Sequence, residues 1–502
     1  MPADTITLST ARPLALDELQ AVAREGAPVG LADDARARIA QGRAVLQDAL
    51  DAGTRVYGLN TGLGHMRDEV IPTEVLLAYQ PMIVTGHAAG VGMALGDAEV
   101  RAMMLARAAG AVRGYSGLSV ATVERYLELL NAGIVPLVPA VGSIGASDLS
   151  HLAAIGQTLI GLGEARYAGE RMPAADALAR AGLEPLVLGP KEGLAVVSEN
   201  AYAIGVGALA LGEIARVLRL ADVAAALTME ATGANLSPLD PEAAVARRFA
   251  GQADVARAIL ALLEGSHLTE PGAAVSLQDP LSVRTVAQVH GAALRTFRDL
   301  AAVVETELNS ADDNPLTSPD TGRAISTGNF HPMELALGFE GMRVALAHLA
   351  LTSERRGSAM ATRLWESLPD PAELWRSAGI GGYAYAATLA RIRTLAGPIT
   401  LNIPALDNGQ EDHATGAPLA VDLTREVTGL LEQMYVGEIA TATVLLSRSG
   451  HRALGRGTGP FAELVREGMA TRGRDESGAD LLDRVGRRIS ARVSARIAPD
   501  QS

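Results

Sequence analysis

Cysteine is absent from the 502 residues of the chain. Its absence excludes disulfide bonds, thiolate nucleophiles and cysteine-ligated zinc, and it fits a cytoplasmic protein. Basic residues are also too few to balance the acidic ones, since 43 lysines and arginines face 57 aspartates and glutamates and leave a net charge of -14. Such a chain does not offer the extended basic groove that nucleic acid requires, so no nucleic-acid partner is expected.

Targeting and membrane signals are missing as well. Residues 1–14 lack the basic start and apolar core of a signal peptide. No stretch of about 18 uninterrupted apolar residues is present, so we expect no membrane span. The sequence shows neither an internal repeat nor a low-complexity tract. These absences favour a globular, cytoplasmic protein.

Helix-forming residues dominate what is present. The composition is 48% hydrophobic and 20% charged, and its alanine, leucine, valine and arginine runs contain few alternating β-branched residues. Long helical patterns predict an all-α bundle, and they cover 201–233, 281–310, 332–365 and 417–449. We expect three parts: residues 1–200 with the active-site loops, residues 201–450 with the long helices, and a peripheral tail at 451–502.

The most distinctive stretch is residues 142–152, read as Gly-Ser-Ile-Gly-Ala-Ser-Asp-Leu-Ser-His-Leu. Its small residues permit a tight turn at Ser147. Asp148 then opens an apolar run and is suited to cap a helix over 149–162, whose N-terminus would direct free N–H groups at the turn. On its residues alone, this stretch is a tight turn followed by a helix cap.

A second glycine-rich loop, 56–64, carries a single tyrosine, Tyr57. It is no phosphate-binding loop, because no Gly-Lys-Ser/Thr follows. Tyr57 is either a buried aromatic with a satisfied hydroxyl or a base. A tyrosinate can remove a weakly acidic proton if an electropositive site at helix N-termini lowers its pKa from about 10.

Two further side chains could bind a ligand. Arg284 could hold a carboxylate through two parallel hydrogen bonds, or form a helix salt bridge. His87 precedes small residues and could hydrogen-bond a polar ring, or be structural. The acidic segment 307–315 lacks the glycine of a calcium loop and is predicted to be a solvated turn, so we expect no metal site.

Six or seven segments between residues 15 and 450 resemble, in order, the motifs of the aromatic amino-acid ammonia-lyase family, which includes histidine, tyrosine and phenylalanine ammonia-lyases and aminomutases. The loop 56–64 is similar to Tyr-Gly-x-Asn-Thr-Gly-x-Gly, and residues 142–149 to Gly-Ser-x-Gly-Ala-Ser-Gly-Asp-Leu. The resemblance implies long antiparallel helices and a smaller N-terminal region with the active-site loops. It also implies a homotetramer in which several subunits build each site.

The resemblance implies roles for individual residues. In the family an Ala-Ser-Gly triplet cyclises and loses water to give a methylidene-imidazolone electrophile, and Ala146, Ser147 and Asp148 stand at that position. Tyr57 would be the catalytic base that removes the β-proton. The implied substrate contacts are His87, Ser198, Gln278, Arg284, Phe330 and Glu411.

Three positions in these motifs depart from the family pattern. The glycine after Ser147 is missing, so that the third residue of the triplet is Asp148; Ser198 replaces an asparagine; and Leu281 replaces a tyrosine. Cyclisation requires the amide nitrogen of the third residue to approach the carbonyl of Ala146, and a Cβ crowds that approach. We therefore expect this triplet to cyclise poorly.

Three functions are compatible with this pattern. The first is an ammonia-lyase-like or aminomutase-like enzyme acting on an aromatic or imidazole amino acid, and Gly86-His87 is closest to the histidine enzymes. The second is an enzyme on the lyase scaffold that lacks the electrophile and uses Tyr57 and Arg284 on a different substrate. The third is a non-catalytic amino-acid-binding homologue. The fumarase-type helical lyases are excluded, because Gly-Ser-Ser-x-Met-Pro-x-Lys is absent.

Overall fold

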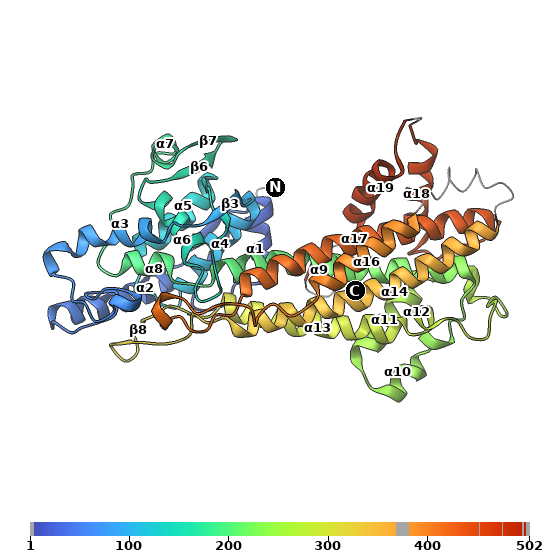
Figure 1. The fold of residues 1–502 in the computed structure, drawn as a ribbon, viewed down its shortest axis with the longest axis horizontal. Helices are drawn as coiled ribbons and strands as arrows, with labels where there is room; N and C mark the ends of the chain where they lie inside the picture. Colours follow the sequence, from blue (N-terminus) through green and yellow to red (C-terminus); the bar gives the residue numbers. More distant parts are fainter. Residues whose placement is uncertain (1–4, 368–380, 451, 474, 494–495, 498–502) are drawn as a thin grey trace. The chain divides into compact units, whose positions relative to one another are not determined.

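The computed structural model describes residues 5–367, 381–450, 452–473, 475–493 and 496–497. Helices make up most of this part of the chain, and the strands are only two to four residues long. Figure 1 shows long helices together with a region of shorter helices and small sheets. The prediction of a mostly helical fold with long helices is confirmed.

The four long helical patterns are observed as predicted. They form α9 (Ala201–Thr232), α13 (Val286–Leu308), α14 (Met333–Glu366) and α17 (Ala417–Arg448). The 281–310 pattern is interrupted once, because Thr285 (φ -102°, ψ 18°) leaves the helical region and separates the single turn α12 (Leu281–Arg284) from α13. Such long helices are stabilised mainly by packing of their apolar faces, which their composition provides.

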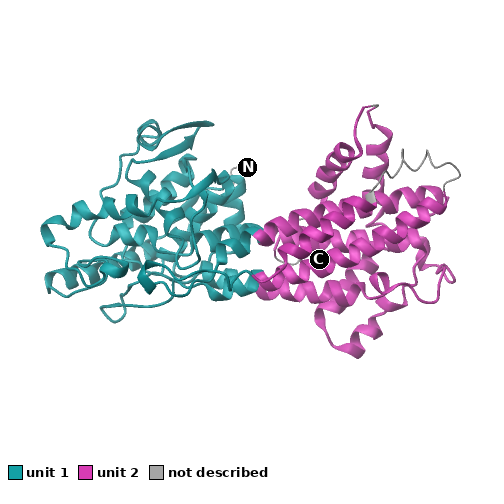
Figure 2. Ribbon diagram, viewed as in Figure 1, with its two compact units in different colours: residues 1–210, 301–339, 399–422 teal, residues 211–300, 340–398, 423–502 magenta. Residues whose placement is uncertain are grey.

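Two compact units are distinguished within the chain (Figure 2). The first contains residues 1–210, 301–339 and 399–422, and the second contains residues 211–300, 340–398 and 423–502. Each unit therefore combines segments that are far apart in the sequence.

The first unit holds most of the shorter elements. Its helices are α1 (Leu16–Gln20), α2 (Asp33–Asp51), α3 (Leu76–His87), α4 (Asp97–Ala111), α5 (Val120–Ala132), α6 (Leu149–Leu159), α7 (Ala174–Arg180) and α8 (Glu192–Val197). Two of its small sheets pair β1 (Ile6–Leu8) with β2 (Val29–Leu31) and β3 (Val91–Ala94) with β5 (Pro139–Val141). A third places β6 (Glu164–Tyr167) between β4 (Val135–Pro136) and β7 (Glu170–Pro173). The fourth pairs β8 (Leu316–Ser318) with β9 (Arg323–Ile325). Only the first of these pairings is parallel.

The second unit adds α10 (Pro241–Arg247), α11 (Ala250–Leu262), α16 (Gly381–Leu395), α18 (Gly459–Ala470) and α19 (Gly478–Arg492). Part of its core is an apolar cluster in which α9, α11 and α13 meet, with Met229, Ile259 and Val286 each at most 2% exposed. A buried ion pair between Arg356 and Glu438 lies in the same unit.

Two described helical segments are long and apolar enough to cross a membrane by length and composition alone: Glu192–Thr232 and Met333–Glu366. The apolar window of the first is 100% buried within the protein and that of the second 44%. A buried core helix passes the same test, so this observation is weak support for a membrane span.

The backbones of helices α9 and α4 lie in direct contact at Gly205. A Cβ added there would lie 2.7 Å from the carbonyl carbon of Ala102 and 2.8 Å from the amide nitrogen of Met103. Backbone atoms cannot move aside as a flexible side chain can. The absence of a side chain at Gly205 therefore sets how closely these two helices pack.

Replacing Gly205 by alanine should lower the free energy of unfolding by about 1–3 kcal/mol, because the added methyl overpacks this contact. Urea unfolding of the variant would measure the loss. Gly429 in α17 is the matched control, since it is exposed and nothing lies within 4 Å of a Cβ added there. Gly429→Ala should stabilise the protein by about 0.5–1 kcal/mol, as expected for an unhindered helical site. Equal effects at both positions would contradict this account of the packing.

Candidate functional site

The turn around Ser147 connects β5 to α6. Gly145 (φ +79°) and Ser147 (φ +62°) both adopt the left-handed conformation. A Cβ on Gly145 would lie 2.3 Å from the hydroxyl of Thr415, so glycine is required there. The N–H of Ser147 donates to the carbonyl of Phe330 at 3.0 Å. A non-glycine residue held at positive φ costs of order 1–3 kcal/mol and is typical of functional sites.

Asp148 stands at the N-cap position of α6, but its side chain makes no capping hydrogen bond there. Its carboxylate instead accepts the N–H groups of Tyr202 (2.8 Å) and Ala203 (3.1 Å), in the first turn of α9, and the hydroxyl of Ser143 (2.6 Å). The predicted side-chain cap of α6 is therefore wrong, because the carboxylate caps a helix that starts more than fifty residues later. Burial is the main cause that raises the pKa of Asp148.

Tyr57 lies in the second loop, where its hydroxyl accepts the N–H of Gly64 at 3.0 Å. Burial raises the pKa of Tyr57, and the carboxylates of Asp407 and Glu411 raise it further, whereas the Gly64 N–H lowers it. The lowered pKa that a tyrosinate base requires is thus not found in the single chain. Burial is the largest cause of the raised pKa, and the acidic side chains of Asp407 and Glu411 add to it.

A third loop, which carries Asp407 and Glu411, contacts the Tyr57 loop. The His65 ring and the Asp407 carboxylate lie 2.7 Å apart, and the His65 N–H donates to Asp407 at 3.0 Å, which ties this loop to the Tyr57 loop. Burial raises the pKa of Glu411, Asp407 raises it further, and His87 lowers it. Tyr57, Glu411 and His87 are therefore close enough for their charges to interact.

Ser198 and Phe330 lie at the Ser147 turn. The hydroxyls of Ser147 and Ser198 are 3.4 Å apart and both are buried. The next residue after Phe330, His331, pairs with His413 at 2.9 Å between ring nitrogens, and His413 lies two residues after Glu411. The Ser147 turn is thereby linked to the loop that carries Glu411.

Gln278 and Arg284 belong to the second unit. The Arg284 guanidinium donates to the side-chain oxygen of Gln278 at 2.6 Å. Exposed apolar side chains flank them, since Leu277 is 88% and Leu281 61% exposed. This apolar exposure fits a segment that another molecule covers.

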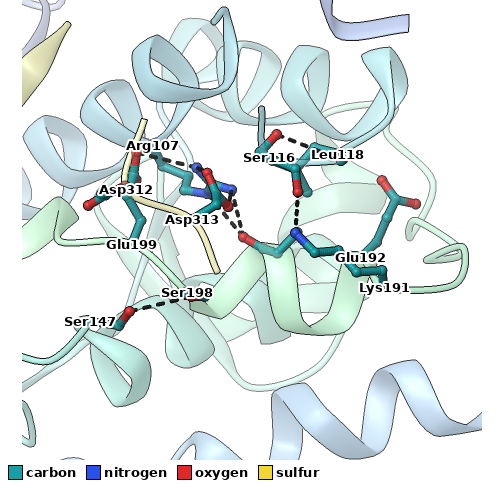
Figure 3. A network of polar contacts seen from close by, with 12 residues as sticks. Arg107, Ser116, Leu118, Ser147, Lys191, Glu192, Ser198, Glu199, Asp312 and Asp313 are labelled. Atoms are coloured by element: carbon teal, nitrogen blue, oxygen red, sulfur yellow. Dashed lines mark hydrogen bonds and ion pairs between the residues drawn. The ribbon is translucent and has the colours of Figure 1, made fainter. Parts of the chain in front are cut away.

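A buried charge network lies close to the Ser147 turn and was not predicted (Figure 3). Arg107, in α4, donates to Asp313 at 2.8 Å and to the carbonyl of Ala195 at 2.7 Å, and it lies 3.3 Å from Glu199. Asp312 accepts both the N–H and the side-chain amide of Asn200. The one signal in the sequence was a lone arginine within the apolar run 102–112.

Two of these carboxylates overturn a prediction. Asp312 and Asp313 belong to the segment 307–315, which the sequence predicted to be a solvated turn, yet they are only 4% and 1% exposed. They are buried because Arg107, 206 residues before Asp313, meets them inside the unit. Among the described residues, no group of three or more His, Asp or Glu side chains is arranged to hold a metal ion.

Comparison with known proteins gives consistent results. Residues 14–467 match the model of the aromatic amino acid lyase family. A histidine ammonia-lyase of Symbiobacterium thermophilum is 37% identical over 465 residues, 91% of each chain. The fold is similar to the ergothioneine-degrading ergothionase of Treponema denticola (TM-score 0.91, 29% identity, covering 97% of this chain and 99% of that one). It is also similar to the histidine ammonia-lyase of Trypanosoma cruzi (TM-score 0.87, 28% identity, covering 97% and 93%).

These findings confirm the resemblance that the motifs around Tyr57 and Ser147 indicated, and the helical fold that accompanies it. They also confirm an ammonia-lyase-like enzyme, that is, a carbon–nitrogen lyase. The chain belongs to the aromatic amino acid lyase family.

Proposed function

We propose that the chain catalyses elimination of the α-nitrogen, together with a β-proton, from an imidazole-bearing L-amino acid. The observation that carries this proposal is the contact of the Tyr57 loop with the Glu411 loop through His65 and Asp407, which places a potential base near Glu411 and His87, two groups that can bind a polar ring. The names of the relatives, histidine ammonia-lyase and ergothionase, support an imidazole substrate. A cytoplasmic location remains a prediction.

In this proposal each side chain has one task. Tyr57, as tyrosinate, takes the β-proton. Glu411 and His87 hydrogen-bond the ring nitrogens, Phe330 packs beside the ring, and Arg284 holds the carboxylate with Gln278 steadying the guanidinium.

We further propose that the enzyme is a homotetramer and that Arg284 reaches the site from another subunit. The exposed apolar residues beside Arg284 support a subunit contact. A guanidinium brought close to Tyr57 would lower the pKa of the phenol, which is raised in the single chain. The base would then become active only in the assembled enzyme.

The methylidene-imidazolone group that the family uses does not fit the residues present. Asp148 has a Cβ where the family has glycine, its N–H donates to the carbonyl of Glu199 at 2.7 Å, and its carboxylate is held by three donors. Cyclisation would break the hydrogen bond to Glu199, because the Asp148 nitrogen would have to turn toward the carbonyl of Ala146, and the three hydrogen bonds of the carboxylate oppose that turn. We therefore derive no step through this group.

Without an electrophile, the leaving nitrogen decides the substrate. A base strong enough to remove a β-proton first deprotonates a primary ammonium, and the resulting neutral amine is a poor leaving group. A quaternary nitrogen has no proton to lose and departs as a neutral tertiary amine. A betaine of an imidazole amino acid is therefore a better substrate than histidine itself, and the likeness to the ergothioneine-degrading ergothionase supports this choice.

Intact mass and absorbance test the prosthetic group. We expect the mass calculated from the sequence, without loss of two water molecules, and no additional near-ultraviolet absorbance. The matched variant inserts one glycine between Ser147 and Asp148, which restores the family pattern and should produce the mass loss if the rest of the turn is competent. A mass deficit in the unmodified protein would contradict the proposal.

The substrate is tested by assaying histidine and its trimethylated betaine side by side for release of ammonia or trimethylamine. We expect the betaine to be turned over at least about 100-fold faster, a difference of roughly 3 kcal/mol in the barrier. Faster turnover of histidine would refute the leaving-group argument. Binding of both without turnover of either would indicate a non-catalytic homologue.

A further inference from the structure

Glu199 carries a buried carboxyl group that takes no part in the proposed chemistry. It lies between α8 and α9, directly after Ser198, and is 1% exposed. One carboxylate oxygen lies 3.3 Å from the Arg107 guanidinium. The other is buried and finds no hydrogen-bond partner among the described residues. An ionised carboxylate in such a place would be left partly uncompensated, which costs free energy.

Acidic groups outnumber cations around Glu199. The titratable groups that face it come from α4, α5, the Ser147 turn and the segment after α13: Arg107, Tyr126, Asp148, Asp312 and Asp313. Arg107 is the one cation in that set. Lys191 is buried nearby, but its amine donates to the carbonyls of Ser116 and Pro315 rather than to a carboxylate.

Glu199 accepts fewer hydrogen bonds than the three aspartates around it. Asp313 accepts from both terminal nitrogens of Arg107, at 2.8 and 3.5 Å. Asp312 accepts two donors from Asn200, and Asp148 accepts three. The Glu199 carboxylate has only its 3.3 Å contact with the Arg107 guanidinium. Burial, more than any neighbour, raises the pKa of Glu199 to about 7.

Glu199 is also central to the support of the Ser147 turn (Figure 3). Its own carbonyl accepts the N–H of Asp148 at 2.7 Å, and the residue before it, Ser198, faces Ser147. The residues that follow it in α9 bind the Asp148 carboxylate. Any shift of Glu199 would therefore move both serines.

We propose that Glu199 is a positioning residue, which in its protonated form, below neutral pH, holds Ser198 and the Ser147–Asp148 turn in place. Loss of the proton would put a buried negative charge beside Asp313, and beside Asp312, whose pKa burial also raises. Repulsion would then displace the 198–203 segment. The inference uses the proposed lyase activity for only one of its three readouts.

The first readout is thermal stability against pH. The folded-state pKa of Glu199 is raised above its ordinary value of 4.5 to about 7, so the protonated group's stability is fully present below the ordinary value and is lost as pH rises through about 7. Glu199→Gln keeps the shape and cannot ionise. Its melting temperature should equal that of the wild type at about pH 5 and exceed it at about pH 8.5. Identical profiles, or a variant that fails to fold at both pH values, would overturn the proposal.

The matched control is Glu192→Gln. Glu192 is equally buried on the neighbouring helix α8, but both of its oxygens accept hydrogen bonds, from Ser119, Thr122 and Gly189. Its variant should have a lower melting temperature than the wild type at both pH values.

The second readout is infrared difference spectroscopy. In the wild type a protonated-carboxyl band should disappear as pH rises through about 7, and the band should be missing from Glu199→Gln. A band that persists unchanged in the variant would also overturn the proposal.

The third readout is kcat/KM against pH. As tyrosinate forms with rising pH, the wild type should gain less activity above about pH 7 than Glu199→Gln, because ionised Glu199 displaces the turn. The same profile in both proteins would overturn the positioning role. If the wild type proves inactive on every substrate tried, the proposed function fails, while melting and infrared spectroscopy still decide the state of Glu199.

Discussion

Replacing Tyr57 by phenylalanine should lower kcat/KM by about 100- to 10,000-fold, the range that a positioned general base contributes. The substitution removes one oxygen and leaves the ring. The hydroxyl accepts a single hydrogen bond, from the Gly64 N–H, so the stability loss should stay near 1 kcal/mol. Activity would therefore fall while the fold persists, and steady-state kinetics with a melting curve would show both.

Tyr435→Phe is the control for loss of a phenolic hydroxyl. Tyr435 is fully buried in the second unit, and its hydroxyl has no hydrogen-bond partner among the described residues. Its variant should keep wild-type kinetics. Unchanged turnover in Tyr57→Phe would refute the assignment of the base.

The same base predicts a direction of pH dependence. Only tyrosinate accepts the β-proton, so activity should increase with pH on the acid side of the profile. Burial and the nearby acids raise the pKa of Tyr57 in the single chain. A cation from another subunit would move this limb to lower pH. Dilution that dissociates the oligomer should then shift the limb upward as well as lower the activity.

Periodicity and composition were sufficient to predict the helices, because a long apolar face requires burial whatever its partner. The motif around Tyr57 was also recognised, since its glycines and asparagine determine the loop locally: Asn60 accepts the N–H of Val56 and donates to the carbonyl of Thr54. The placement of Gln278 and Arg284 at the site remains a prediction.

The burial and the hydrogen-bond partners of the acidic residues could not be predicted, because they depend on long-range contacts. Asp148 has the local sequence of a cap for α6, yet the N-terminus of α9 receives its carboxylate. Asp312 and Asp313 lie in a polar segment that would be solvated if no cation met it, and Arg107 does so from a distant helix. The pKa of Tyr57 likewise depends on long-range contacts, because burial raises it most and the acids that raise it further lie 350 or more residues later along the chain.

The second unit contains a buried ion pair that is sensitive to loss of one partner. Arg356 and Glu438 are both 0% exposed in their side chains and lie 2.6 Å apart. The Glu438 carboxylate also accepts the hydroxyls of Thr228 and Ser353, and Arg356 donates to the carbonyl of Ser282. The pair thus connects α9, α14 and α17, and it holds α12, which ends in Arg284.

Glu438→Leu should lower the free energy of unfolding by about 3–5 kcal/mol, because it leaves the Arg356 guanidinium buried without a counter-charge. That is a large share of the roughly 5–15 kcal/mol that stabilises a folded domain. The double variant Arg356→Met with Glu438→Leu removes both charges and should recover most of the loss in urea unfolding. Because methionine cannot donate to the carbonyl of Ser282, α12 should be loosened in the double variant and its KM should be raised. A single variant that costs under about 1 kcal/mol, or a double variant no more stable than the single one, would show that the charges are solvated rather than buried.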